Sequence, residues 1–393
     1  MKRVAVLGGG PAGAMTAERL ASAGVDTVIL DEKLAWEKPC GGGITYKAYR
    51  EYPFLLENDT PKKIVRRSFL AESRVGAVGM ELTQPLLIYS RKDLNGMMLK
   101  RAEKAGAQVE QARVMGIERR DSGWEVRTKT GSLTADYVVV ATGARNPLRD
   151  VGTQWTAGDT MIALGYYVPA AQEHIDIHFF PQFEGYIWVF PRCGHLSVGI
   201  CGKGESSAAL RARLESYMRE KEISLKDAMF FAHAIPALES GAFRNNRVAG
   251  DGWMAVGDAA GLVDPVTGEG LYYAFRSGDL ASQALLNDAH PLAERADVYR
   301  RMMRHDFMED LIFGAGLAKR FFIQRFLFST VPARMIEFMR KSPRFREIVQ
   351  DLFAGTQGYL DLKKRLMESL NGTLLELFMG TMLGTRVVKE PNG

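Results

Sequence analysis

The first 32 residues constrain the fold of this chain more than any other stretch. Residues 4–7 are apolar, as in a buried strand, and they lead into three glycines spaced as GxGxxG, at Gly8, Gly10 and Gly13. Apolar residues at helical spacing follow, and residues 27–30 are predicted to form a second strand. This order of strand, glycine turn, helix and strand predicts a βαβ unit and therefore a parallel sheet.

The glycine spacing predicts a site for an adenine dinucleotide. The first glycine permits the turn, the second lets the backbone approach a pyrophosphate, and the third lets the helix pack on the strand. The helix then points its N-terminus at the phosphates. Ala12 is an early residue of this helix, and we assign it to the cofactor as well as Gly8, Gly10 and Gly13. Asp31 ends the second strand, where a carboxylate can accept hydrogen bonds from ribose hydroxyls; Glu32 takes this role if the register shifts by one residue.

Two distant stretches favour FAD over NAD as the dinucleotide. In "ADYVVVATGARNPLR" a strand at residues 137–140 runs into a glycine turn, and in "GWMAVGDAAGLVDPVTGEGLYY" a strand at residues 253–256 is followed by Asp258. The carboxylate of Asp258 suits ribitol hydroxyls, and the helix that residues 268–270 open would stabilise the anion of reduced flavin. From these stretches we assign to the cofactor Ala141, Gly143, Gly257, Asp258, Pro265, Gly268, Gly270 and Leu271.

Charge and cysteine usage exclude several classes of function. The 393 residues carry a net charge of only +5 and no dense basic tract, so we expect no nucleic-acid partner. The three cysteines form no CxxC pair, which favours a reducing, cytoplasmic location. His174 and His178 lie four apart, but their stretch alternates like a strand, so they form no helical metal pair and we assign no metal site.

The flavin stretches resemble FAD-dependent oxidoreductases of the p-hydroxybenzoate hydroxylase and geranylgeranyl reductase superfamily, over most of residues 1–290. The resemblance implies that the GxGxxG turn and the acid hold the ADP half, and that the Gly-Asp segment holds the ribitol. It also implies that Arg91 opens a helix beside the flavin and that the backbone of Val114 meets adenine. Hydroxylases of this group have Asp-Gly where this chain has Thr142-Gly143, a departure that argues against their handling of NADPH.

A second unit lies between the flavin stretches. Residues 161–202 are rich in aromatic and β-branched residues and are interrupted by Pro and Gly, which predicts an antiparallel sheet. In "GYIWVFP" the rings of Tyr186, Trp188 and Phe190 recur at period two and share one face. Such a face is either part of the core or, because the stretch resembles the YxWxFP motif of geranylgeranyl reductases, the lining of a substrate channel.

The stretch "WEKPCGGGITYK" places Cys40 directly before Gly41 and Gly42. It resembles the cysteine loop of the geranylgeranyl reductases, and we assign the two glycines to the cofactor because bare backbone lets an isoalloxazine ring approach. An isolated C=C bond has no carbonyl to share charge, so its reduction needs a nearby proton donor, and a thiol can serve. The alternative is that Cys40 is an inert small residue packed under the ring. Cys193 and Cys201 lie in the sheet pattern, and we expect both in the core.

From about residue 291 the pattern becomes helical. One interpretation is a helical cap whose apolar face packs on the flavin domain. The other is a basic amphipathic surface that rests on lipid. The residues on which the second interpretation depends are Lys319, Arg320, Phe321, Phe322, Arg325, Phe326, Leu327 and Phe328.

Together these patterns predict an α/β protein. We expect a Rossmann-type FAD-binding domain, an inserted antiparallel β-sheet domain for the substrate, and a C-terminal helical region. The expected boundaries are 1–65, 91–155 and 248–290 for the first, 66–90 and 156–247 for the second, and 291–393 for the third.

The resemblance implies a reductase that saturates C=C bonds of a polyprenyl lipid or quinone side chain. A flavin monooxygenase or halogenase is the alternative, because "GYIWVFP" also resembles the GWxWxIP motif of halogenases. A prenyl-binding carrier like the GDP-dissociation inhibitors shares the fold, but Asp31 and the Gly-Asp segment argue against it. No second GxGxxG is present, so the electron donor is either a transiently bound NAD(P)H or a donor protein such as ferredoxin. A hydrophobic prenyl substrate would also favour peripheral contact with the inner face of the membrane.

Overall fold

The predicted βαβ unit lies at the centre of the first of two large sheets. The computed structural model describes residues 1–121, 123–148, 151–153, 156–326, 328–362 and 364–366. The unit consists of β1 (Arg3–Leu7), α1 (Pro11–Ser22) and β2 (Asp26–Asp31). β1 pairs in parallel with β2 on one side and with β10 (Tyr137–Val140) on the other, so the prediction from the apolar runs is confirmed.

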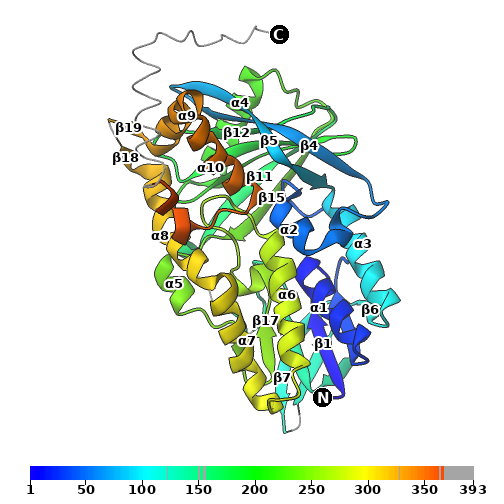
Figure 1. Cartoon of the computed structure of the whole chain (residues 1–393). Coiled ribbons are helices and arrows are strands. Elements are labelled where there is room, and N and C mark those ends of the chain that lie inside the picture. The colour runs from blue at the N-terminus through cyan, green and yellow to red at the C-terminus, as the bar shows by residue number, and fades with distance from the viewer. Residues whose placement is uncertain (122, 149–150, 154–155, 327, 363, 367–393) are drawn as a thin grey trace.

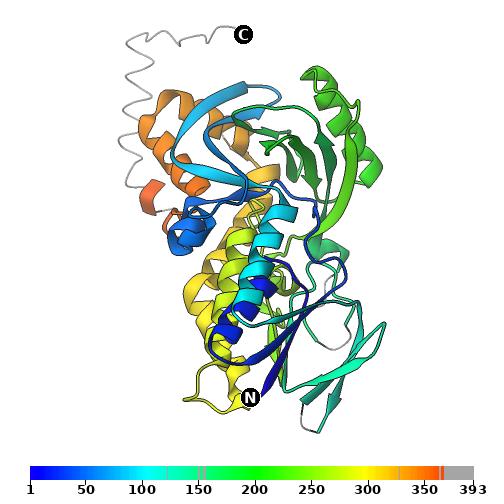
Figure 2. The same ribbon diagram turned by 90° about the vertical axis from the view of Figure 1, so that its right-hand side faces the viewer.

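The first sheet has six strands in the order β16-β17-β10-β1-β2-β6. All its pairings are parallel except that of β16 with β17 at one edge. α1 packs between two helices, α3 and α6, on one face, and the small sheet of β7, β8 and β9 contacts the other face (Figure 2). The bounds are β6 (Gln108–Gln111), β7 (Val114–Arg120), β8 (Gly123–Thr128), β9 (Ser132–Ala135), β16 (Ala249–Gly250), β17 (Trp253–Ala255), α3 (Arg91–Lys104) and α6 (Leu271–Leu285).

The second sheet has eight strands in the order β15-β11-β14-β13-β12-β4-β5-β3. The antiparallel sheet that the sequence predicts is present, but the pairing of β12 with β4 is parallel. The reason is that β4 and β5 come from a separate, earlier hairpin, and no tight turn sets the direction in which that hairpin joins β12. The bounds are β3 (Gly43–Ile44), β4 (Lys62–Glu72), β5 (Gly76–Tyr89), β11 (Thr160–Val168), β12 (Ile175–Phe179), β13 (Gly185–Pro191), β14 (Leu196–Gly202) and β15 (Met229–Pro236).

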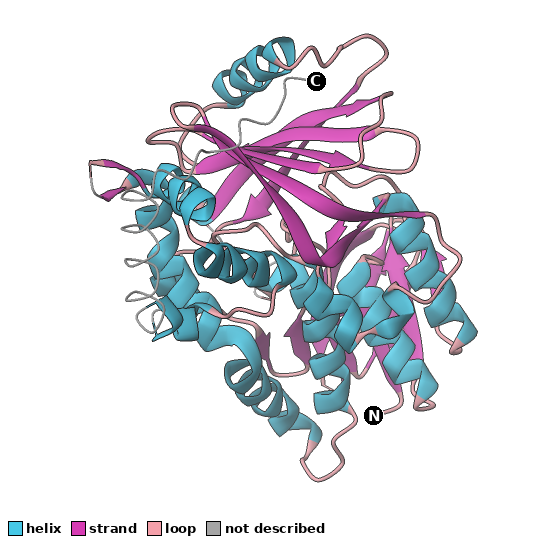
Figure 3. Cartoon of the chain, turned by 45° about the horizontal axis from the view of Figure 1, so that its top comes forward, coloured by secondary structure: helices cyan, strands magenta, loops and turns pink. Residues whose placement is uncertain are grey.

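Helices cover both faces of this second sheet (Figure 3). α4 (Ser207–Glu220) contacts β11 and β14 on one face. On this side Ile187 and Val189 belong to one buried apolar cluster, whereas Trp188 belongs to a second cluster on the opposite face. The period of two in "GYIWVFP" therefore sends alternate side chains to different layers, as predicted.

The C-terminal region is helical, as expected, but its packing differs from the prediction of a cap on the flavin domain. α7 packs on α6 of that domain, and Leu311 and Ala315 of α8 join its core, whereas α9 and α10 contact β4 and β5 of the second sheet (Figure 1). The cap spans both domains because the second sheet also exposes an apolar face that must be covered. Leu327 and residues 367–393 lie outside the described residues. The elements are α7 (Arg295–Met303), α8 (Glu309–Ile323), β18 (Arg325–Phe326), β19 (Ser329–Thr330), α9 (Val331–Lys341) and α10 (Pro343–Ala354).

Two further observations bear on the sequence-based expectations. Cys201 is buried in β14, as predicted, but Cys193, also expected in the core, is exposed in the turn between β13 and β14, where no second layer can cover it. Within the described residues, every helix is too short or too polar to cross a bilayer.

Tyr359 connects the C-terminal region to the segment that precedes α6 through a hydrogen bond. Its hydroxyl lies 2.8 Å and 3.0 Å from the two carboxylate oxygens of the buried residue Asp264. We expect Tyr359→Phe to lower the free energy of unfolding by about 1–3 kcal/mol, because a buried acceptor loses a donor. Urea denaturation measures the change. Tyr46→Phe is the control, since no described residue bonds its hydroxyl, and equal losses for both variants would contradict this account.

Candidate functional site

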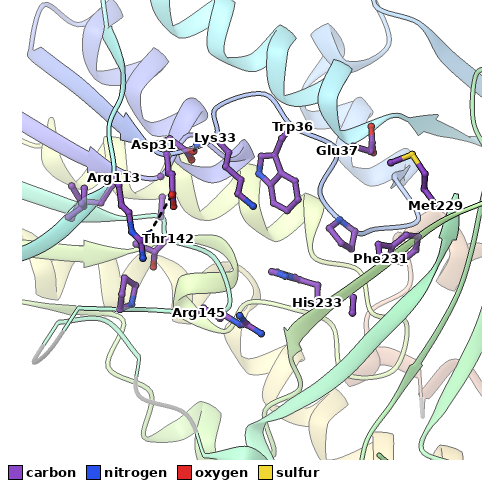
Figure 4. Close-up of a pocket in the computed structure, with 18 of the residues that line it drawn as sticks. Asp31, Lys33, Trp36, Glu37, Arg113, Thr142, Arg145, Met229, Phe231 and His233 are labelled. Atoms are coloured by element: carbon purple, nitrogen blue, oxygen red, sulfur yellow. Dashed lines mark hydrogen bonds and ion pairs between the residues drawn. The ribbon is translucent and has the colours of Figure 1, made fainter. Parts of the chain in front are cut away.

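A large cleft opens where the strands of the first sheet end and the second sheet begins. Its volume is about 1180 Å³. Trp36, Arg145 and His233 extend into it from three different segments (Figure 4). Ligands of parallel α/β sheets bind at the carboxyl ends of the strands, which is where this cleft lies. The predicted cofactor residues that line it are Gly8, Asp31, Glu32, Val114 and Ala141.

The three glycines of the turn have different structural roles. Gly8 has φ of +117°, and a Cβ there would lie 2.1 Å from the carbonyl oxygen of Ala141. A Cβ on Gly13 would lie 2.0 Å from the carbonyl oxygen of Gly8. Around Gly10, by contrast, there is no heavy atom of the described chain within 4 Å of such a Cβ. The first and third glycines are therefore required by packing, and the second leaves open backbone at the start of α1.

Ala12, the second residue of α1, lies at the contact between α1 and the Gly-Asp segment. It is buried, and a Cβ on Gly257 would lie 3.0 Å from the Cβ of Ala12. A small residue at this position lets the two segments approach each other.

The acids at the end of β2 differ in their surroundings. One oxygen of Asp31 accepts a hydrogen bond from the Gly9 amide at 2.7 Å, and the other accepts from the amides of Lys33 and Leu34. Asp31 thereby connects the glycine turn to the loop that follows β2. Glu32 is more than half exposed and lies 3.6 Å from Arg113, at the rim of the cleft.

Asp258 lies close to Lys38, with its Oδ2 atom 2.7 Å from Nζ. Burial raises the pKa of Asp258, but Lys38, Arg91 and His233 more than offset this effect, so the pKa is lower than usual. Burial, with Lys38 and other cations, lowers the pKa of His233 to about 4. At neutral pH the site therefore holds an ionised carboxylate and a neutral imidazole.

Several buried polar atoms around the cleft have no hydrogen-bond partner among the described residues. Arg91, the first residue of α3, is 4% exposed, and its Nε atom is one of them. The Nε2 atoms of His195 and His233, which line the cleft, are two more. Buried polar groups normally have partners, so these atoms and the open backbone at Gly10 fit a ligand rich in phosphates and hydroxyls. FAD has this chemistry.

The segment before α6 is shaped by glycine and by a half-buried acid, Glu269. Gly268 has φ of +72° and follows Thr267, whose carbonyl oxygen accepts a hydrogen bond from Tyr186 at 2.6 Å. Glu269 accepts from the Tyr272 amide at 2.8 Å, and burial raises its pKa to about 7. Gly270 is the N-cap of α6, which begins at Leu271 as predicted, and Pro265 is buried upstream.

The Cys40 loop lies between this cofactor cleft and the second sheet. The thiol is half-buried, and the Gly42 amide donates to Sγ at 3.3 Å. Gly42 has φ of +85°, and a Cβ there would lie 2.1 Å from the carbonyl oxygen of Tyr89. A Cβ on Gly41 would lie 2.8 Å from the ring of Phe190, so the ring packs directly on the loop. Gly143, in the turn after β10, faces the same loop and would place a Cβ 3.9 Å from Nζ of Lys38.

Two residues that the sequence did not single out hold this loop. The guanidinium of Arg192, 1% exposed, donates to the carbonyl oxygen of Cys40 and pairs with Glu37. Glu37 also accepts from the amides of Arg91 and Lys92 at the start of α3. Burial raises the pKa of Glu37, but Arg192 and these donors lower it below its usual value. Sequence analysis did not find this pair, because Glu37 and Arg192 lie 155 positions apart and no local sequence pattern connects them.

The aromatic residues of β13 lie on the face of the second sheet that α9 and α10 cover. The rings of Tyr186 and Trp188 are 6.4 Å apart. Trp188 donates to Ser197 at 3.2 Å, and Ser197 donates to the carbonyl oxygen of Cys40 at 3.0 Å. The rings therefore connect to the Cys40 loop rather than to the large cleft, and their contact with a substrate stays a prediction.

The parallel sheet, its glycine turn and the donors around the cleft define a Rossmann-type FAD-dependent oxidoreductase. Comparison with protein families supports this class. Residues 88–280 match the family model of FAD dependent oxidoreductases, and residues 2–160 match that of pyridine nucleotide-disulphide oxidoreductases.

Known relatives indicate which family of FAD-dependent oxidoreductases the chain belongs to. The chain is 30% identical over 349 residues to geranylgeranyl diphosphate reductase of Oryza sativa subsp. japonica, which covers 77% of this chain and 71% of the relative. It is also 30% identical over 317 residues to the Arabidopsis thaliana protein of that name, covering 72% of this chain but only 65% of the relative's length. Menaquinone reductase of Mycobacterium tuberculosis is 28% identical over 320 residues, covering 74% of this chain and 77% of the relative. The chain belongs to the geranylgeranyl reductase family of FAD-dependent oxidoreductases.

Solved structures share the fold. A geranylgeranyl bacteriochlorophyll reductase-like protein from Thermoplasma acidophilum has a TM-score of 0.74 at 20% identity, covering 94% of this chain and 99% of that one. A flavin-dependent brominase has a TM-score of 0.68 at 16% identity, covering 90% of this chain and 93% of that one. At these identities the similarity describes the fold alone.

The roles of Gly10 and Gly13 can be separated experimentally. Gly10→Ala should change the stability of the protein without flavin by less than about 0.5 kcal/mol, because its methyl group meets open space. It should raise the dissociation constant for FAD at least tenfold, about 1.4 kcal/mol, by obstructing the backbone. Gly13→Ala should instead cost about 1–3 kcal/mol of stability through overpacking. Urea denaturation and flavin fluorescence titration measure the two effects, and normal FAD affinity of Gly10→Ala would remove this glycine from the cofactor site.

The charge of Glu37 should make the Cys40 loop sensitive to acid. Because its pKa is lowered in the folded state, Glu37 stabilises the fold above its unfolded pKa of about 4.3, and this contribution is lost as the pH falls through the folded value. Glu37→Gln should therefore be less stable than wild type at pH 7, with a smaller difference below pH 4. Breaking a fully buried pair costs about 3–5 kcal/mol, and the partial exposure of Glu37 reduces this.

Chemical denaturation at both pH values measures this dependence. Glu32→Gln is the matched control, since its pair with Arg113 is solvent-exposed and should contribute little. If Glu37→Gln lost no more stability at pH 7 than Glu32→Gln does, Arg192 would have to be satisfied by carbonyl oxygens alone.

Proposed function

We propose that the protein is a FAD-dependent reductase that saturates C=C bonds of a polyprenyl chain, carried by a geranylgeranyl lipid or a quinone. One observation carries this proposal: the Cys40 loop contacts both the cofactor cleft and an aromatic layer. Glu37 and Pro39 line the cleft, and Gly41 packs on Phe190 of β13. A thiol between a site for a flavin and an apolar surface is the arrangement that this reaction requires.

The relatives support a prenyl substrate. One is named for the reduction of geranylgeranyl diphosphate and another for that of menaquinone. The aromatic layer has the matching chemistry, because rings at a buried face bind an apolar chain and exclude water. Tyr186, Trp188 and Phe190 are the residues that we assign to this contact.

Reduction of an alkene adds a hydride to one carbon and a proton to the other. When bound in its reduced form, FAD supplies the hydride. The protein must supply the proton close to an apolar chain, and we assign this role to the thiol of Cys40. Arg192 and Ser197 fix the carbonyl oxygen of Cys40 and so hold the loop in place. Burial raises the pKa of Tyr186 well above its usual value, so its hydroxyl stays protonated.

The electron donor belongs to the same proposal. We expect a reduced nicotinamide nucleotide or a ferredoxin to reduce the flavin. Anaerobic mixing of the protein with each donor, followed by the loss of flavin absorbance, distinguishes them. If neither donor reduced the flavin, this part of the proposal would be wrong.

Substitution of Cys40 tests the proton-donor role. Cys40→Ser is nearly isosteric but far less acidic, so it should slow the reoxidation of reduced flavin by a geranylgeranyl lipid, by about 10²–10⁴-fold. FAD content and the rate of flavin reduction should stay near those of wild type. Anaerobic stopped-flow absorbance measures both half-reactions separately.

Cys40→Ala controls for packing in the same experiment. Loss of flavin from both variants would make the thiol structural, and alkene reduction at the wild-type rate in both would assign the proton to another group. Reoxidation by oxygen and halide, with no reaction with the alkene, would favour a halogenase instead.

A further inference from the structure

The end of α8 and the β18–β19 hairpin expose large apolar side chains. Phe328, which has φ of +66°, is 97% exposed, and Phe326 is 50% exposed. Ile323, at the end of α8, is 37% exposed. Such residues are normally buried, and clusters of them on a surface mark a contact site. We call Ile323, Phe326 and Phe328, with the adjacent cations Lys319, Arg320 and Arg325, the basic–aromatic tip.

The charge around this tip is strongly one-sided. Residues 311–346 contain eight Lys and Arg residues but a single acid, Glu337. Glu337 pairs with Arg334, so it does not neutralise the cations of the tip. Lys319, Arg320 and Arg325 are all exposed. The whole chain carries only +5, so the positive charge is concentrated here. A basic surface with protruding aromatic side chains fits the headgroup region of an anionic lipid bilayer.

A row of aromatic rings leads inward from the tip to the second sheet. Phe321 and Phe322, at the end of α8, lie 5.0 Å apart between ring centroids, and Phe321 lies 5.7 Å from Phe179 of β12. The row continues from Phe179 to Tyr186 at 6.2 Å and from Tyr186 to Trp188 at 6.4 Å.

The inner end of the row reaches the Cys40 loop. Trp188 is joined to the carbonyl oxygen of Cys40 through Ser197, and Phe190 packs on Gly41. An apolar layer therefore connects the tip with the loop to which we assign the chemistry.

We propose that the basic–aromatic tip docks this protein on an anionic lipid bilayer. The side chains of Phe326 and Phe328 enter the interface, and Lys319, Arg320 and Arg325 contact the lipid phosphates. The tip then faces the bilayer from which a prenyl chain can pass along the aromatic row toward Cys40, a second step that rests on the proposed function.

An acidic partner protein could also bind the positive charge of the basic–aromatic tip, but the exposed apolar side chains of the tip favour the bilayer. Phe328 is almost wholly exposed at the end of a two-stranded hairpin, a shape that inserts between headgroups. In Figure 1 the hairpin protrudes at the side of the molecule that carries α8 and α9, far from the first sheet. A protein that delivers electrons to the flavin would need to approach the cleft instead.

Vesicle flotation of the full-length flavoprotein tests the docking directly. Vesicles of phosphatidylcholine, with or without phosphatidylglycerol, are floated through a density gradient with the protein. We expect the protein to float with anionic vesicles and far less with neutral ones. The double variant Phe326→Ser and Phe328→Ser should partition roughly 10²–10⁴-fold more weakly, because each Phe that enters the interface contributes about ten- to a hundredfold to the partition coefficient. Changing Lys319, Arg320 and Arg325 to Gln should abolish the preference for anionic vesicles.

Ile64→Thr is the matched control, because Ile64 on β4 lies outside the tip and its exposed fraction of 51% is similar to the 50% of Phe326. Its flotation should equal that of wild type, and thermal unfolding should be unchanged in every variant because the altered side chains are exposed. Flotation of the Phe double variant like wild type would overturn the proposal, as would failure of wild type to float with either vesicle. Binding of heparin by wild type and the Phe double variant alike, without flotation, would instead identify an acidic macromolecule as the partner. Flotation requires no turnover, so a failure of alkene reduction does not alter this result.

Discussion

The ion pair between Arg192 and Glu37 is the interaction on which the arrangement of this site depends. Arg192 brings a full positive charge into a position that is 1% exposed. Such a charge is tolerable only when it is paired and its donors are used, and here Glu37 and the carbonyl oxygens of Cys40 and Gly41 use them. Glu37 at the same time caps α3 of the first sheet. One buried charge thereby connects the flavin domain, the Cys40 loop and the second sheet, and it explains how a glycine-rich loop keeps a defined position.

The two sheets present different chemistry: the first carries polar groups and the second carries apolar side chains. The first ends in a cleft lined by the buried donors of His195 and His233, and the open backbone at Gly10 and the ionised Asp258 belong to the same sheet edge, all suited to phosphates and hydroxyls. The second presents a face of aromatic rings beneath α9 and α10. The Cys40 loop lies between the cleft and this aromatic face, which is the arrangement that the proposed reduction of an apolar chain requires. The basic–aromatic tip extends the apolar layer to the surface, which accounts for exposed rings that a purely structural cap would bury.

The local patterns of the sequence predicted well wherever neighbouring residues decide the outcome. The strand at residues 137–140 and the start of α6 at Leu271 were predicted at the observed positions, because an apolar run and a glycine turn act over a few residues. The division of "GYIWVFP" between two layers followed from the pleat of a strand. Predictions that needed a distant partner fared worse: Cys193 is exposed, β12 joins β4 in parallel, and the helical cap spans both sheets.

The sequence by itself determined the class of this protein: the βαβ unit, the three glycines and the acid that follows them are local features that specify a dinucleotide site. Only the tertiary structure decided how Cys40 is held and what it faces. Arg192 lies 155 positions from Glu37, and Phe321 lies 142 positions from Phe179, yet these contacts join the loop to the aromatic row. The physical reason is that local patterns report backbone conformation and the burial of one face, whereas ion pairs and ring contacts form between segments that meet only when the sheets and helices pack.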